Sequence, residues 1–181
     1  MGATKRLAEL LIGMFEPNGT RYFTVRFGNV MDSDGSVLPL WREQIKAGEP
    51  ITITDERCER YFMSIASAVG LIASVIDMAP RKGTFVLDMG EPIKLIDLAR
   101  ELIAKSGKDI PIKTIGLRPG EKLTEELFHG GTLISTSDPK VFEIDEPKRP
   151  PVDWKKMADL FKACDDCNRE AAVKLLWELV C

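Results

Sequence analysis

The chain has 181 residues, of which 44% are hydrophobic and 29% charged, and its formal net charge is −3. These values exclude a marginal mini-protein and a disordered chain, and they show no basic surplus of the kind that nucleic-acid binding needs. No apolar stretch is long enough to cross a bilayer and no signal peptide opens the chain, so we expect no membrane insertion and a cytoplasmic location, although an upstream membrane anchor would be compatible with it.

Helices and strands alternate along the first two thirds of the chain. In the first helix Leu7, Leu10 and Leu11 recur at three- and four-residue spacing, which predicts an amphipathic helix. The run from 20 to 30 is rich in β-branched and aromatic residues, which predicts a strand covered on both faces. Similar patterns predict helices over 2–15, 37–46, 65–78 and 94–106, and strands over 20–30, 51–54, 84–88 and 110–115.

The last third of the chain is less regular. A turn at 117–122 is predicted to open a helix over 123–128, and residues 141–144 resemble a strand. The proline-rich run Pro147–Pro151 is typical of a linker. After it, helical spacing over 154–161 and 169–180 predicts a helical hairpin.

Three features could carry chemistry. Arg60 and Arg118 lie at turn or strand edges, where guanidinium groups can face an anionic ligand; the alternative is a pair of surface arginines in ion pairs. Asn29 ends a strand of an α/β pattern, where ligands bind, or else it only turns the chain. Lys5 opens the first helix against the helix dipole, which marks either a function or an exposed solubilising charge.

Metal and redox sites find little support in the sequence. His129 is the only histidine, so a histidine-based metal site or a serine–histidine triad is not expected. Cys164 and Cys167 have the spacing of a redox or zinc half-site, but without a second pair they favour two helix-turn thiols. We therefore expect no metal and reduced cysteines.

Six motifs occur in an order that matches one enzyme family. They are Met1–Glu9, Val25–Val30, Gly35–Leu40, Arg60–Met63, Leu87–Pro92 and Gly116–Lys122. Together they resemble the CapD-like polysaccharide-biosynthesis nucleotide-sugar 4,6-dehydratases, which belong to the extended short-chain dehydrogenase/reductase superfamily. The resemblance covers the chain from Met1 to about Pro147.

The resemblance implies an α/β fold that is the carboxy-terminal part of such an enzyme. Residues 1–32 would be a remnant of the Rossmann-like NAD(P)-binding domain, 33–147 a small mixed α/β nucleotide-sugar-binding domain, and 148–181 a C-terminal helical tail. The glycine-rich dinucleotide fingerprint does not occur in the sequence, so the cofactor-binding half is missing and we expect no turnover by this chain alone. The first helix and strand should then expose apolar surface.

The activity implied by the resemblance is that of a UDP-N-acetylglucosamine 4,6-dehydratase of surface polysaccharide or glycan synthesis. In that family a tightly held NAD or NADP takes hydride from C4, water is lost across C5 and C6, and the hydride returns at C6. The implied partners are a UDP-N-acetylhexosamine substrate and the missing Rossmann half, with a homo-oligomer as a further option. Nucleic acid is not among them.

The resemblance also implies roles for single residues. Met1 and Lys5 take the places of the superfamily's Tyr-x-x-x-Lys pair and would be catalytic, with acid–base work moved to upstream residues in the branch that carries methionine. The implied cofactor contacts are Lys5 and Phe27. The implied substrate contacts are Asn29, Arg60 and Arg118 at the sugar diphosphate, Glu121 near the uridine ribose, and Ser36, Val37 and Pro39 around the nucleotide.

Two other functions stay open. A nucleotide-sugar 4-epimerase or reductase would share the arginine pair. A stand-alone UDP-sugar-binding module could instead partner a separately encoded Rossmann half.

Overall fold

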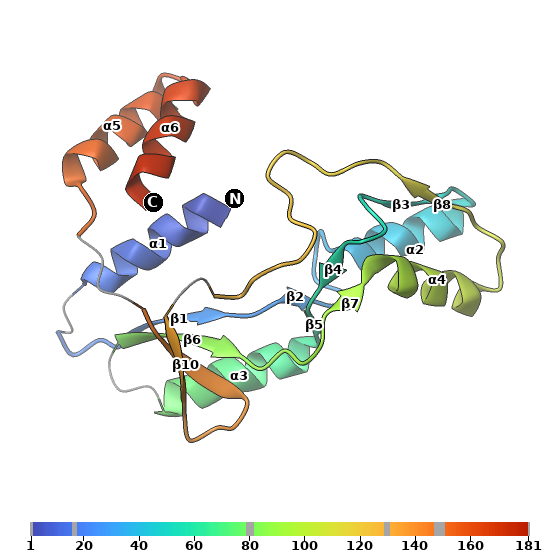
Figure 1. Cartoon of the computed structure of the whole chain (residues 1–181), viewed down its shortest axis with the longest axis horizontal. Coiled ribbons are helices and arrows are strands. Elements are labelled where there is room, and N and C mark those ends of the chain that lie inside the picture. The colour runs from blue at the N-terminus through green and yellow to red at the C-terminus, as the bar shows by residue number, and fades with distance from the viewer. Residues whose placement is uncertain (1, 16–17, 79–81, 129–130, 147–150, 181) are drawn as a thin grey trace.

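A computed structural model describes residues 2–15, 18–78, 82–128, 131–146 and 151–180 (Figure 1). Its helices are α1 (Gly2–Met14), α2 (Val37–Ala47), α3 (Ile65–Met78), α4 (Leu95–Ser106), α5 (Trp154–Asp165) and α6 (Arg169–Val180). Its strands are β1 (Tyr22–Arg26), β2 (Asn29–Val30), β3 (Ile51–Ile53), β4 (Glu59–Arg60), β5 (Phe62–Met63), β6 (Lys82–Leu87), β7 (Ile93–Lys94), β8 (Ile112–Thr114), β9 (Thr132–Ser135) and β10 (Val141–Asp145). The predicted helices over 2–15, 37–46, 65–78 and 94–106 and the predicted helical hairpin are confirmed.

A four-stranded sheet forms the larger lobe, in the order β1-β6-β10-β9. β1 runs parallel to β6, whereas β10 is antiparallel to both of its neighbours. Figure 1 shows α1 on one side of this sheet and α3 on the other. Buried side chains of α3 pack against the sheet, among them Leu71 and Val75 with Phe85 and Val141. Strands β6, β9 and β10, from later in the chain, thus complete the sheet that begins with β1. The division of the chain into domains at residues 32 and 147 stays a prediction.

The predicted strand over 20–30 is interrupted at Gly28. A Cβ atom on Gly28 would lie 2.6 Å from the carbonyl oxygen of Tyr61, so only glycine allows this close approach of the two chain segments. The Asn29 amide donates to the same Tyr61 oxygen at 2.7 Å. The chain therefore leaves the large sheet after β1 and begins a separate parallel pair, β2 with β5.

The smaller lobe consists of α2 and α4 around the parallel pair β3–β8. Its core includes the fully buried Trp41, whose indole Nε1 donates to the Thr52 carbonyl at 2.8 Å. Gly48 and Gly107 follow α2 and α4 in left-handed backbone conformation, with φ of 76° and 67°. The short pairs β2–β5 and β4–β7 lie between the two lobes (Figure 1).

The predicted helix over 123–128 is wrong. The backbone there is extended or turned, and Thr124 forms a β-bridge with Glu59. The Leu123 carbonyl accepts from the Glu59 amide and from Arg60 Nη1, both at 2.8 Å. Because these partners belong to β4, the segment is stabilised by pairing with a distant strand rather than by its own helical bonds.

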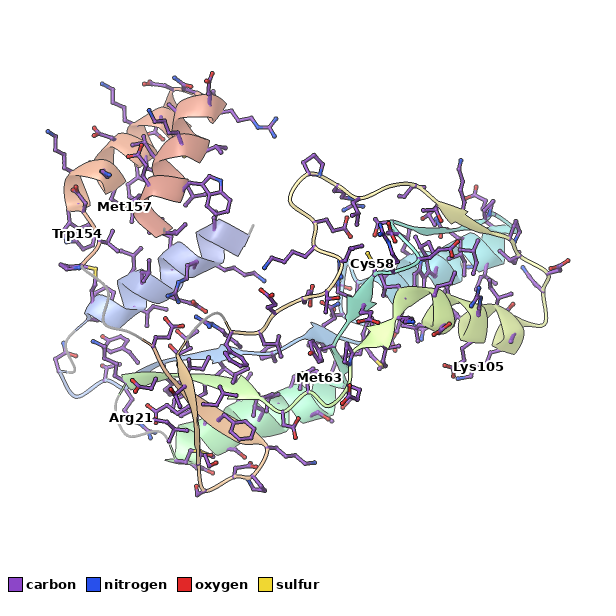
Figure 2. The ribbon with its side chains drawn as sticks, in the orientation of Figure 1. Arg21, Cys58, Met63, Lys105, Trp154 and Met157 are labelled. Carbon is purple, nitrogen blue, oxygen red and sulfur yellow. The ribbon has the colours of Figure 1, made fainter. Side chains whose placement is uncertain are left out.

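The tail forms an antiparallel helical hairpin that packs on α1. Asp153 caps α5, since its carboxylate accepts from the Lys155 and Lys156 amides. Figure 2 shows Trp154 and Met157 on the first turns of α5, near α1. Cys164 and Cys167 are exposed free thiols around the end of α5, as predicted. The predicted linker, Pro147–Pro151, lies outside the described residues except for its last proline.

Candidate nucleotide-sugar site

Most of the predicted substrate contacts come from three segments between or beside the two lobes. Asn29 lies in β2, Arg60 lies in β4, and Arg118 and Glu121 lie in the loop that follows β8. Asn29 pairs with Phe62 of β5, which follows β4 almost directly. The strand pairing therefore brings Asn29 and Arg60 to the same region of the molecule.

Arg60 is buried, with 8% of its surface exposed. Its Nη1 donates to the Glu59 and Leu123 carbonyls, each at 2.8 Å. Two carboxylates also contact the guanidinium at 3.3 Å, Glu121 at Nη2 and Glu125 at Nε. The alternative of an arginine in protein ion pairs thus describes Arg60 in this structure, where its positive charge is met by groups of the chain itself.

The Glu121 carboxylate contacts three other residues. Besides its contact with Arg60, it accepts from the Thr54 hydroxyl at 2.9 Å and from the Arg118 backbone amide at 3.1 Å. The Glu121 backbone amide donates a hydrogen bond to the Arg118 carbonyl oxygen at 2.9 Å, which closes the turn. The Arg118 side chain is exposed. One buried arginine thus fixes a turn that presents a second arginine to solvent.

The start of α2 contains the remaining predicted nucleotide contacts, Ser36, Val37 and Pro39. Ser36 is the residue before α2, and its side chain makes no capping bond to the helix. Its Oγ is buried and has no hydrogen-bond partner among the described residues. A buried hydroxyl without a partner is unusual, and a helix N-terminus favours negatively charged groups. The contact of Ser36 with a nucleotide stays a prediction.

The predicted cofactor contacts lie on different surfaces. Lys5 is exposed on the first turns of α1. Phe27 is half-buried and packs against the apolar cluster between α3 and the large sheet. Met1 lies outside the described residues, as does His129. Strand-to-helix turns occur before α2, α3 and α4, and none of these described turns contains the glycine pattern that holds a dinucleotide pyrophosphate. A nicotinamide dinucleotide therefore does not fit the described residues alone.

Sequence reasoning missed an ion network of four residues, Arg6, Glu9, Arg26 and Glu146. Arg26 donates from Nε and Nη2 to the two Glu9 oxygens at 2.8 and 2.7 Å, and from Nη2 to Glu146 at 2.6 Å. Arg6 bonds Glu146 at 2.6 Å and Glu9 at 2.9 Å. Only the Arg6–Glu9 pair, at helical i,i+3 spacing, has a signal in the sequence.

The network shifts the pKa values of its members. Burial alone would raise the pKa of Glu9, but hydrogen bonds from Arg26 and Arg6 outweigh it and hold the pKa below its usual value. Burial alone would also raise the pKa of Glu146. Hydrogen bonds and charge interactions with Arg6 and Arg26 outweigh burial, so the pKa of Glu146 is lowered as well. Both carboxylates are therefore ionised more firmly than in the unfolded chain.

The described residues contain no group of three or more acidic, histidine or cysteine side chains placed to hold a metal ion. They also contain no helix that is long and apolar enough to span a membrane.

Comparison with known proteins places the chain. The sequence profile of the family described as "Polysaccharide biosynthesis protein" matches residues 1–146. The chain belongs to this family. The matched region does not include the helical hairpin.

Two curated members are similar over most of the matched region. The probable polysaccharide biosynthesis protein EpsC of Bacillus subtilis is 47% identical over 133 residues, and the capsular polysaccharide biosynthesis protein CapD of Staphylococcus aureus is 50% identical over 134. Each match covers 71% of this chain and 22% of the relative. A third relative, from Methanocaldococcus jannaschii, is 45% identical over 139 residues and is named a membrane protein. The chain thus spans about a fifth of the length of its first two relatives.

Solved structures confirm the predicted fold class. The structure of Pen from Bacillus thuringiensis matches with 39% identity and a TM-score of 0.71, over 81% of this chain and 48% of that one. A UDP-glucose 4-epimerase of Thermotoga maritima with UDP-glucose matches with 19% identity and a TM-score of 0.61, over 71% of this chain and 44% of that one. At such identity the second match concerns the fold alone. The chain is an α/β portion of this kind of enzyme structure, covering under half of each.

Proposed function

We propose that the chain is the nucleotide-sugar-binding portion of a UDP-N-acetylglucosamine 4,6-dehydratase-like enzyme of surface polysaccharide synthesis. The observation that carries this proposal is the turn at Arg118, which Glu121 and the buried Arg60 fix in place. The relationship to the capsular protein CapD and to EpsC supports the pathway. A cytoplasmic location is part of the same proposal, because nucleotide sugars are made there.

In this proposal Arg118 binds the diphosphate directly, since its exposed, planar guanidinium matches phosphate oxygens. Arg60, whose own charge is paired with Glu121 and Glu125, lies behind it and keeps the turn ordered. Asn29 contacts the sugar diphosphate, and Ser36, Val37 and Pro39 surround the nucleotide. Glu121 lies near the uridine ribose while its carboxylate organises the turn.

NAD or NADP, which supplies hydride transfer when bound, belongs to a portion outside this chain. The sheet supports such a portion, because β1 is an edge strand with β6 as its one partner among the described strands. A parallel strand from the cofactor-binding portion would pair along that edge. Lys5, on the helix before β1, would face the cofactor from this side.

Isothermal titration calorimetry tests the binding role. We expect UDP-N-acetylglucosamine to bind this chain and NAD not to bind. Arg118→Ala should weaken UDP binding about ten- to hundred-fold, the value of one or two charge-assisted hydrogen bonds. Lys156→Ala is the control, because Lys156 pairs with Glu178 on the distant hairpin. Equal, negligible effects of both changes would refute the diphosphate contact, and turnover by this chain alone would refute the division of labour.

A 4-epimerase is the second candidate, favoured by one observation. A UDP-glucose 4-epimerase of Rickettsia canadensis is 33% identical over 162 residues, which covers 87% of this chain and 46% of that protein. Product analysis with the cofactor-binding portion present separates the two candidates, because only a dehydratase releases a 4-keto-6-deoxy sugar nucleotide. If activity appears only after a separate Rossmann polypeptide is added, the chain is a partner module.

A further inference from the structure

The apolar side of α1 faces the helical hairpin and not the sheet. Leu7 is buried in a cluster with Met157 and Leu160 of α5 and Val180 of α6. The cluster that packs against the other side of the sheet contains residues of α3, β1, β6 and β10, and none of the described α1 residues. The helices α1, α5 and α6 therefore share a core of their own.

Charged side chains join this three-helix unit to the sheet. The ion network of Arg6, Glu9, Arg26 and Glu146 connects α1, the end of β1 and the residue after β10. It contains six hydrogen bonds between 2.6 and 3.3 Å. Its two positive and two negative groups balance, and each side chain is only 17–20% exposed.

This ion network differs from an ordinary surface ion pair. Arg26 and Glu9 meet in a two-bond fork, which fixes orientation as well as distance. Removal of Glu9 would leave two guanidinium groups around one carboxylate, at partial burial, where the repulsion is weakly screened. The geometry of the fork, and not only its charge, should therefore hold α1 in place.

The network residues are close in sequence to two residues of the candidate site. Lys5 immediately precedes Arg6, and Asn29 follows three positions after Arg26. We propose that Glu9 and Arg26 are positioning residues, which fix Lys5 on α1 relative to the carboxyl end of β1. The consequence for the cofactor rests on the proposed function, whereas the attachment of α1 to the sheet does not.

Hydrogen–deuterium exchange on this chain tests the attachment. In Glu9→Gln the amides of the first half of α1 should exchange about ten-fold faster, while those of α3 and β6 stay at wild-type rates. Arg26→Lys, which keeps the charge but breaks the fork, should have the same effect. Asp32→Asn is the matched control, because it removes an exposed pair with Arg42 and should change nothing in α1.

Three outcomes of this experiment would overturn the proposal. Unchanged exchange in α1 of Glu9→Gln would show that the network does not hold the helix. Equal acceleration in α1, α3 and β6 would show a general loss of stability and no positioning role. Wild-type behaviour of Arg26→Lys would likewise reject the fork as the positioning element.

A second measurement, with the cofactor-binding portion present, addresses Lys5. NAD affinity is measured for the fraction of molecules that bind UDP-N-acetylglucosamine. In this fraction, Glu9→Gln should bind NAD about ten-fold more weakly than wild type and should bind the UDP-sugar with normal affinity. A merely structural role would lower the number of binding molecules but not the cofactor affinity of those that bind. Loosened α1 with unchanged NAD affinity would overturn the assignment of Lys5 to the cofactor, and with it that part of the proposed function.

Discussion

At the scale of single residues, Arg60 and Glu121 explain how a surface turn is made rigid. Arg60 is buried and bonded to two carbonyls and two carboxylates. Such a group is costly to desolvate unless every partner is in place. Glu121 provides one partner and at the same time accepts the Arg118 amide. The position of Arg118 is therefore coupled to the satisfaction of a buried charge.

Glu121→Gln should test that coupling. The change keeps the shape but removes the negative charge beside Arg60, so we expect a loss of about 1–3 kcal/mol in the free energy of unfolding, measured by urea denaturation. UDP binding should weaken as well, because the Arg118 turn loosens. Glu101→Gln removes an exposed helical pair with Lys105 and should stay within about 0.5 kcal/mol of wild type. Similar losses in both variants would argue against the coupling.

Gly28 offers a second test at a single position. Gly28→Ala would place a Cβ 2.6 Å from the Tyr61 carbonyl oxygen and 2.7 Å from the Tyr61 Cβ, so the two chain segments must shift apart. We expect a loss of about 1–3 kcal/mol in thermal or chemical unfolding. In Gly70→Ala, within α3, the new methyl would meet nothing within 4 Å, and helix propensity predicts a gain of about 0.5–1 kcal/mol. A harmless Gly28→Ala would mean that the segments do not approach this closely in solution.

At the scale of elements, local periodicity was sufficient for the long helices and insufficient for the short strands. The helix over 65–78 and the helix over 169–180 were predicted with their observed ends, because apolar spacing and flanking turns are local signals. The two-residue strands between the lobes exist only through pairing with distant segments, which no local pattern records. The wrong helix over 123–128 has the same cause, since its backbone bonds go to β4.

The same contrast applies to the candidate site. Arg60, Arg118 and Glu121 were identified from motifs, but their mutual bonds depend on the parallel approach of β4 to the segment after β8, where Glu59 bridges to Thr124. Arg26 and Glu146 were not singled out, because they are 120 residues apart in sequence and meet only through the sheet. Residue types could thus be predicted, whereas partners could not.

The ion network predicts how stability depends on pH. Glu9 and Glu146 have lowered pKa values in the folded chain, whereas in the unfolded chain carboxyls of this type titrate near about 4.3. The unfolded state therefore binds these protons more tightly, so the stabilisation is complete above about pH 5 and is lost as the pH falls through the folded pKa values. In urea unfolding at pH 7, the free energy of unfolding should be larger for wild type than for the double variant Glu9→Gln, Glu146→Gln. This difference should become smaller toward pH 3. A difference that is constant with pH would exclude the two carboxylates as its source.

At the scale of the whole molecule, the described residues form two unequal lobes, and β1 is one of the two edge strands of the large sheet. The core of the small lobe is closed on itself, with Trp41, Ile51 and Ala99 fully buried. The larger lobe keeps apolar side chains in solvent near β1, including Ile12 at 36% and Phe15 at 55% exposure. This agrees with the expectation of exposed apolar surface at the end of the first helix, whereas the residues of β1 are half-buried.

The edge of β1 leads to a prediction about association. An open strand edge with apolar neighbours promotes pairing between molecules, so the isolated chain should self-associate as its concentration rises, measured by sedimentation velocity. Addition of the cofactor-binding portion should suppress this association and slow hydrogen exchange at those β1 amides that point away from β6, because a new parallel partner would accept them. The amides of β8, in the closed small lobe, serve as the internal control and should not change. Slower hydrogen exchange in β8 but not in β1 would indicate that the cofactor-binding portion binds the small lobe. The edge of β1 could then not be the surface that joins the two halves of the site.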